Sequence, residues 1–280
     1  MSVLKTYLQK VSKRLGVYHR LKASWVYDLY WTVADKQWAK SKKMEVDFYR
    51  NLLQGFRRNN LILDVGANHG FKTDVYLRLG ARVVAVEPDE LCQDILKDKF
   101  LRYRLYPRPV TIVGKALSDQ NATETMWVDG PGSAFNSLSK KWVETLKQDK
   151  ARFECPDSEF NFSQSRTVET TTLDLLIAKY GQPFFVKIDV EGNEVCALRG
   201  LKRPVPYLSF EVNLPEFKTE GKQCLKLLEA LDAEGKFNYT PDCKDGLRLV
   251  DWVDAQEHCG VLERCTEKSI EVFWRTWKDA

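Results

Sequence analysis

The sequence predicts an α/β fold built on a largely parallel sheet, and three stretches support this prediction. Apolar runs at residues 61–65, 82–86 and 184–188 each have the length of a buried strand, and each carries an acidic residue at or just beyond its end. Stretches of helical periodicity separate the runs, as in βαβ units. Because open α/β sheets bind ligands at the carboxyl ends of their strands, these acids predict a site at that edge.

The first strand leads into a turn that contains Gly66 and Gly70, and helical spacing follows over residues 71–79. Glycine in such a turn lets the backbone approach a ligand closely. The second strand ends in Glu87, whose carboxylate is placed to accept both hydroxyls of a ribose. Asn68 stands where a dinucleotide fingerprint has its middle glycine, which disfavours a pyrophosphate ligand.

The composition indicates one large catalytic domain with an appendage. The chain has 280 residues, and its 44% hydrophobic content excludes a disordered protein. Seven cysteines, none in a C-x-x-C pair, favour a reduced cytoplasmic protein over a disulfide scaffold. A zinc site near the C-terminus is disfavoured because closely paired ligands are missing. No apolar run approaches the roughly 20 residues that span a bilayer, so the chain is expected to be soluble or peripheral to the membrane.

Residues 1–56 predict a basic, aromatic-rich helical region in front of a catalytic domain over residues 57–280. Residues 1–60 carry 13 Lys and Arg against 4 Asp and Glu, a net charge of +9, whereas the remainder carries −5. One interpretation is a helical cap that packs on the sheet or beside the cleft. Another is peripheral contact with an anionic membrane surface. Nucleic acid is disfavoured as a partner, because the body is acidic and lacks a known binding signature.

The remaining pattern completes an alternating fold. A third strand is expected at residues 110–118, and residues 119–165 predict a polar insertion over the cleft, since long loops in compact domains are usually functional or mobile. The pattern predicts an edge strand at residues 166–171 and a helix at residues 172–181. It then predicts a strand at residues 206–213, a helix at residues 224–231, and two closing strands at residues 237–240 and 269–276.

Two acids, Asp189 and Glu191, follow the strand that contains Lys187. Their place at the carboxyl end of a strand predicts a functional role for at least one of them. The structural alternative is capping of the helix that begins near Asn193. A divalent ion held by Asp189, Glu191 and Glu211 is conceivable, but carboxylates at strand ends often bind none, and no metal is predicted.

Two motifs together resemble one known family. The first is D-V-G-A-N-H-G at residues 64–70, followed by E-P at 87–88, and the second is K-I-D-V-E-G-N-E at 187–194, followed by L-R-G at 198–200. This combination resembles the FkbM family of S-adenosylmethionine-dependent methyltransferases, over roughly residues 61–213. The resemblance implies a class I methyltransferase fold, a Rossmann-like sheet of seven strands with the last antiparallel, here with an N-terminal helical cap.

The resemblance also implies a cofactor, a substrate class and a set of site residues. The cofactor would be S-adenosyl-L-methionine, with Asp64 facing its methionine amino group, and the family mostly methylates hydroxyl oxygens of sugars, glycans and natural products. The turn at residues 64–70 would hold the methionine end, Glu87 the ribose, and Ala116 with Leu117 the adenine. The expected cofactor-binding residues are Asp64, Gly66, Ala67, Asn68, His69, Gly70, Glu87, Pro88, Ala116, Leu117 and Asp189.

Transfer of a methyl group to an alcohol needs alignment of the acceptor and removal of its proton. Asp189 is the first candidate for the general base, Glu191 the second and His69 the third, although His69 in the cofactor turn better suits support of the loop. N-methylation of a small amine is an alternative reaction. A catalytically silent scaffold that docks a partner through the basic N-terminus is an alternative of another class, but such a scaffold has no need of the acidic strand ends.

Overall fold

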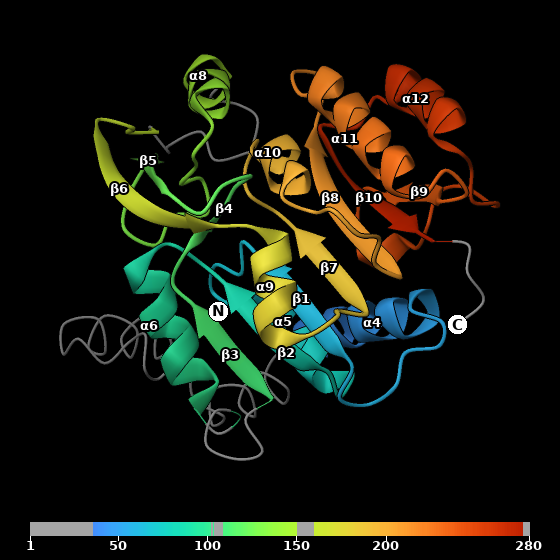
Figure 1. Cartoon of the computed structure of the whole chain (residues 1–280), viewed down its shortest axis with the longest axis horizontal. Coiled ribbons are helices and arrows are strands. Elements are labelled where there is room, and N and C mark those ends of the chain that lie inside the picture. The colour runs from blue at the N-terminus through green and yellow to red at the C-terminus, as the bar shows by residue number, and fades with distance from the viewer. Residues whose placement is uncertain (1–35, 102, 104–108, 150–159, 277–280) are drawn as a thin grey trace.

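The computed structural model describes residues 36–101, 103, 109–149 and 160–276 (Figure 1). Most of the predicted basic N-terminal region, residues 1–35, lies outside the described residues, so its contact with a membrane stays a prediction. The described end of this region forms helix α4, Lys36–Leu52. None of the helices in the described residues is both long and apolar enough to cross a membrane.

A seven-stranded sheet forms the centre of the molecule, in the order β3-β2-β1-β7-β8-β10-β9. Strand β10 pairs antiparallel with both β8 and β9, whereas the pairs from β3 to β8 are parallel. The predicted α/β fold with its last strand antiparallel is confirmed. The strands are β1 Leu61–Val65, β2 Arg82–Val86, β3 Val110–Val113, β7 Phe185–Ile188, β8 Tyr207–Asn213, β9 Lys236–Thr240 and β10 Ser269–Arg275.

Helices cover both faces of this sheet because its strands are apolar on both sides. Leu61, Leu63 and Val65 of β1 belong to the core cluster beneath α9 to α12, whereas the intervening Ile62 packs with α4 and α5. Figure 1 shows α9 to α11 in front of the strands. The helices are α5 Phe71–Arg78, α6 Glu90–Lys99, α9 Leu173–Tyr180, α10 Glu194–Arg199, α11 Lys218–Leu231 and α12 Ala255–Arg264, with the short 3-10 helix η1 Cys243–Asp245.

A second sheet of three strands, in the order β4-β6-β5, lies to one side of the first (Figure 1). It consists of β4 Ala116–Leu117, β5 Thr123–Val128 and β6 Gln164–Thr171, and helix α8, Lys140–Gln148, follows β5. The sequence analysis predicted neither α8 nor α12. Helix α8 is amphipathic, with Trp142, Val143 and Leu146 on its buried face, but its nine residues are too few for this spacing to stand out in the sequence.

Phe185 of β7 joins the central sheet to the helices of one face. Its side chain is fully buried, and its ring centroid lies 5.7 Å from that of Tyr49 in α4 and 5.8 Å from that of Tyr76 in α5. Because truncation leaves a cavity among these rings, Phe185→Ala should lower the free energy of unfolding by about 3–5 kcal/mol, measured by urea denaturation. The half-buried neighbour Phe184 is the control, and its replacement by Ala should cost clearly less. A loss of under about 1 kcal/mol for Phe185→Ala would contradict this packing.

Candidate functional site

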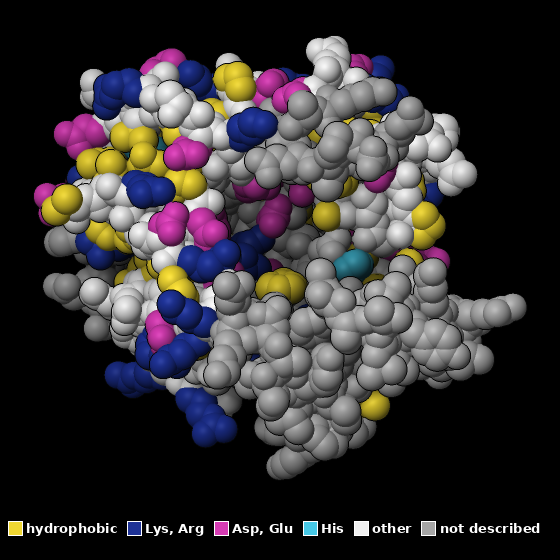
Figure 2. All heavy atoms as spheres, turned by 180° about the vertical axis from the view of Figure 1, so that it is seen from behind, with side chains coloured by type: hydrophobic (Ala, Val, Ile, Leu, Met, Phe, Trp, Pro, Cys, Tyr) yellow, Lys and Arg dark blue, Asp and Glu magenta, His cyan; other side chains and the backbone are white. Residues whose placement is uncertain are grey.

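A cleft lies at the carboxyl ends of β1, β2 and β7, where open α/β sheets keep their ligands. The cleft has an empty volume of about 700 Å³, and this volume includes the solvent space at its open mouth. The residues after these three strands, strand β4 and residues 133–138 form its walls. Figure 2 shows the rear of the molecule, which is hollowed near its centre, with acidic and basic side chains gathered around the hollow.

The turn after β1 is shaped by a close approach of two loops. Gly66 adopts a φ of 77°, and a Cβ at this position would lie 1.7 Å from the backbone carbonyl oxygen of Asp189. No side chain fits there, so the predicted need for glycine has a specific cause. Asn68, at a φ of 44°, also lines the cleft, and its side-chain oxygen accepts a hydrogen bond from the backbone N–H of His69 at 2.7 Å.

Glu87 stands at the end of β2 with its carboxylate fixed in the cleft wall. One oxygen accepts the backbone N–H of Asn68 and the other accepts that of Asp89, both at 2.8 Å. Desolvation raises the pKa of Glu87 to about 7, against the lowering effect of the two N–H groups. A carboxylate held in this way is suited to accept the paired hydroxyls of a ribose.

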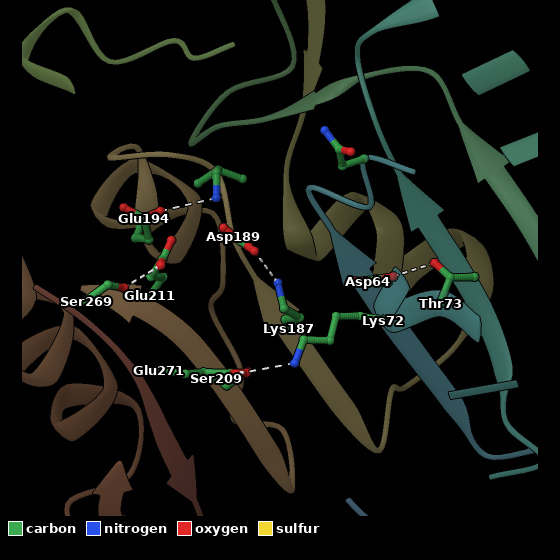
Figure 3. Close-up of polar contacts among 12 residues, drawn as sticks. Asp64, Lys72, Thr73, Lys187, Asp189, Glu194, Ser209, Glu211, Ser269 and Glu271 are labelled. Atoms are coloured by element: carbon green, nitrogen blue, oxygen red, sulfur yellow. Dashed lines mark hydrogen bonds and ion pairs between the residues drawn. The ribbon is translucent and has the colours of Figure 1, made fainter. Parts of the chain in front are cut away.

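Asp64 is buried in the sheet beside the cleft turn. It is fully buried and is not part of the cleft lining, because side chains alternate along β1 and Asp64 shares the face of Ile62, beneath α5. Its carboxylate accepts a hydrogen bond from the hydroxyl of Thr73 (Figure 3). Desolvation raises its pKa, and the nearby ammonium of Lys187 partly offsets this. Its contact with the methionine amino group of the cofactor stays a prediction.

Three other predicted cofactor residues, Ala67, His69 and Gly70, also lie outside the cleft lining. Gly70, with a φ of 72°, is the N-cap residue of α5, and the carbonyl groups of His69 and Gly70 accept hydrogen bonds from the Lys99 ammonium at 3.0 Å. These residues shape the turn rather than the wall. Their contact with a cofactor, and that of His69 with a proton, stays a prediction.

The apolar part of the cleft suits a purine. Ala116 and Leu117 of β4 are buried and line the cleft, and Met126 and Pro88 add apolar surface. A flat aromatic base gains from such apolar contact. The predicted adenine residues and Glu87 thus line one cleft, which fits an adenosine moiety.

A buried ion pair underlies the loop after β7. The ammonium of Lys187, 4% exposed, lies 2.6 Å from a carboxylate oxygen of Asp189 (Figure 3). Desolvation alone would lower the pKa of Lys187, but the charges of Asp189, Glu271 and Asp64 raise it above its usual value. Desolvation alone would raise the pKa of Asp189, but the charge of Lys187 and its hydrogen bond outweigh this effect and lower the pKa. Asp189 is therefore a carboxylate, and a weak base, at neutral pH.

Three acids meet beyond this pair. Asp189, Glu191 and Glu211 each place a carboxylate oxygen within 4.8 Å of the others. Desolvation and repulsion from Glu211 and Asp189 raise the pKa of Glu191 well above its usual value, and desolvation together with Asp189 raises that of Glu211 to about 8. The group offers hard oxygen ligands of the kind that Mg²⁺ takes, and among the described residues it is the one such cluster.

Sequence reasoning found the acids at the strand ends but missed other parts of the site. The cleft wall at residues 133–138 falls within the insertion predicted over the cleft at residues 119–165, but no motif singled out these residues. Glu194 was noted in the second motif without a role, yet its carboxylate accepts the backbone N–H groups of Val190 and Gly192, both at 3.2 Å. Its spacing of three from Glu191 was the available signal, because an acid at the start of a helix often bonds to the preceding turn.

Fold and site together define an S-adenosylmethionine-dependent methyltransferase of class I. The sheet order, the carboxylate after β2 and the apolar residues of β4 fit the adenosine of this cofactor, and Asp189 and Glu191 after β7 line the same cleft. Residues 64–239 match the family model described as the methyltransferase FkbM domain, and the chain belongs to this family. The predicted family and the predicted cofactor, S-adenosyl-L-methionine, are confirmed.

Several solved methyltransferase structures are similar at low identity. A TehB-like SAM-dependent methyltransferase from Corynebacterium glutamicum has 10% identity and a TM-score of 0.41, with 83% of this chain and 87% of that chain covered. A putative methyltransferase from Streptococcus mutans, in complex with SAH, has 12% identity and a TM-score of 0.39. In this comparison 84% of this chain and 97% of that chain are covered. No curated protein matches the chain. The family match is the finding that identifies it.

The carboxylate of Glu87 should make cofactor binding depend on pH. Because its pKa is raised to about 7, it binds a proton as the pH falls from 8 to 6 and then accepts hydrogen bonds less well. The affinity for S-adenosylhomocysteine, measured by calorimetry, should fall over this range, by at most about tenfold per pH unit. Glu87→Gln should bind about 10- to 100-fold more weakly at pH 8 and lose this pH dependence.

The exposed neighbour Glu90 provides a matched control, since Glu90→Gln removes a carboxylate from the same segment but not from the cleft. This variant should bind as the unmodified chain does. Affinity that is constant from pH 6 to pH 8 in the unmodified chain, or Glu87→Gln binding with undiminished affinity, would contradict the assignment.

Proposed function

We propose that this methyltransferase transfers the methyl group to a hydroxyl of a sugar, a glycan or a natural product, and that Glu191 removes the acceptor proton. When bound, the cofactor supplies an electrophilic methyl group on a sulfonium. The observation that carries the proposal is that Asp189, Glu191 and Glu211 each place a carboxylate oxygen within 4.8 Å of the others, and that Asp189 and Glu191 also line the cleft. A hydroxyl is a poor nucleophile, so a carboxylate within hydrogen-bond reach is what this reaction needs.

The protonation of these acids supports Glu191 over Asp189 as the base. The ion pair with Lys187 keeps Asp189 charged and weakly basic, although Asp189 was the first candidate on sequence grounds. The pKa of Glu191 is raised well above its usual value by burial and by the charges of Glu211 and Asp189, so its carboxylate is a stronger base than that of Asp189. Asp189, which also lines the cleft, is then suited to orient the acceptor or to balance the positive charge of the sulfonium.

N-methylation of a small amine is the second candidate, and the same three acids favour it. A cluster of carboxylates attracts an ammonium group and could accept its proton before transfer. Hydroxyl and amine acceptors are separated by the position of the new methyl group, so the substrate screen below decides between them.

Turnover should be measured with ¹³C-methyl-labelled S-adenosylmethionine and a panel of sugars, glycans and small amines, with the product examined by NMR. We expect an O-methyl product. Glu191→Gln should reduce kcat by about 100- to 10,000-fold, because it removes the base, while its affinity for S-adenosylhomocysteine stays close to that of the unmodified chain.

The matched control is Glu229→Gln, at an exposed position of α11 far along the chain from the cleft, and it should leave kcat unchanged. Full turnover by Glu191→Gln would rule out this residue as the base. An N-methyl product would decide for the second candidate.

A further inference from the structure

The connection between β5 and α8 contacts both sides of the cofactor cleft. Residues 133–138 line the cleft, and two neighbours among them, Asn136 and Ser137, make side-chain hydrogen bonds to opposite walls. This connection lies outside the two family motifs, and the proposed reaction uses neither residue. The contacts on each side show what the pair does.

Asn136 reaches the ribose side of the cleft. Its amide N–H₂ donates to the carboxylate of Asp89 at 3.1 Å, and its amide oxygen accepts the backbone N–H of Asp129 at 2.9 Å. The backbone N–H of Asp89 in turn donates to Glu87 at 2.8 Å. Asn136 is therefore one hydrogen-bonded residue away from the carboxylate that is placed to hold the ribose.

Ser137 reaches the acidic side of the cleft. It is 3% exposed, and its hydroxyl donates to the backbone carbonyl oxygen of Glu191 at 2.6 Å. Its own backbone is fixed to β5, because its N–H and C=O pair with those of Trp127 at 3.1 and 2.8 Å. The carbonyl group of Glu191 is thus held by a residue of the second sheet.

The backbone of Glu191 needs such support. Its φ of 53° is uncommon for a residue with a side chain, and the following Gly192 has no room for one, since a Cβ would lie 2.8 Å from the ring of Phe217. Glu194 holds the N–H groups on either side of Glu191, those of Val190 and Gly192. Ser137 supplies the remaining contact, and together they fix where the Glu191 carboxyl group points.

We propose that Asn136 and Ser137 are positioning residues that couple occupancy of the ribose site at Glu87 to the backbone geometry of Glu191. The contacts form one continuous path from Glu87 through Asp89, Asn136 and Ser137 to Glu191. When the ribose of the cofactor binds at Glu87, this path also fixes the backbone of the loop that carries Glu191, before any acceptor binds. The catalytic meaning of the coupling rests on the proposed role of Glu191, but the coupling itself is a property of the backbone.

Hydrogen exchange followed by mass spectrometry tests the coupling without an acceptor. With the full chain, saturating S-adenosylhomocysteine should slow amide exchange in a peptide that covers residues 189–193. In Ser137→Ala this slowing should be about fivefold smaller, the change expected for one lost hydrogen bond, while the affinity for S-adenosylhomocysteine stays within about threefold. Ser137→Thr keeps the hydroxyl and should keep the slowing, which separates the hydrogen bond from general damage to the fold.

Ser165→Ala is the matched control, because it removes an exposed hydroxyl from β6, at the position that pairs with Trp127 from the other side. It should retain the slowing. Equal slowing in Ser137→Ala and the unmodified chain would overturn the proposal, as would an unmodified chain that binds S-adenosylhomocysteine without any slowing. Full turnover by Glu191→Gln would instead contradict the proposed base and leave the coupling intact.

Discussion

The site depends on one close approach, between Gly66 after β1 and the backbone carbonyl group of Asp189 after β7. A Cβ at Gly66 would lie 1.7 Å from that carbonyl oxygen, so the two strand ends can meet only if this residue is glycine. Strands β1 and β7 are direct neighbours in the sheet, which brings their loops together. The turn that begins the cofactor cleft and the loop that carries the acids are therefore a single structural unit.

Charge balance within this unit sets what each acid can do. Lys187 neutralises Asp189 from within the sheet, and the row of polar side chains beneath α4 and α5 continues through Ser209 to Glu271 (Figure 3). Glu191 and Glu211 have raised pKa values, and neither forms a direct ion pair within the described residues. One buried lysine thus leaves a charged carboxylate beside two acids whose pKa values are raised, a combination suited to both alignment and proton removal.

Much of this architecture could be predicted from the sequence, since apolar runs that end in acids mark parallel strands and their ligand edge. Glu87, Asp189 and Glu191 line the cleft, and their roles toward the cofactor and the acceptor stay predictions. The position of Asp64 could not be predicted from the motif, because strand alternation under α5 decides which way its side chain points. Residues 133–138 belong to the insertion predicted over the cleft, but their individual contacts could not be predicted, since they depend on the pairing of Ser137 with Trp127 across a turn rather than on a local pattern.

The central claim is that one cleft places the cofactor between Glu87 and the acids after β7. A crystal structure of the chain with S-adenosylhomocysteine tests it most directly. In this structure both ribose hydroxyls should bind the carboxylate of Glu87. The adenine should lie against Leu117, and the sulfur should face Asp189 and Glu191. A ribose bound away from Glu87, or a sulfur on the side of the cleft opposite the acids, would contradict it.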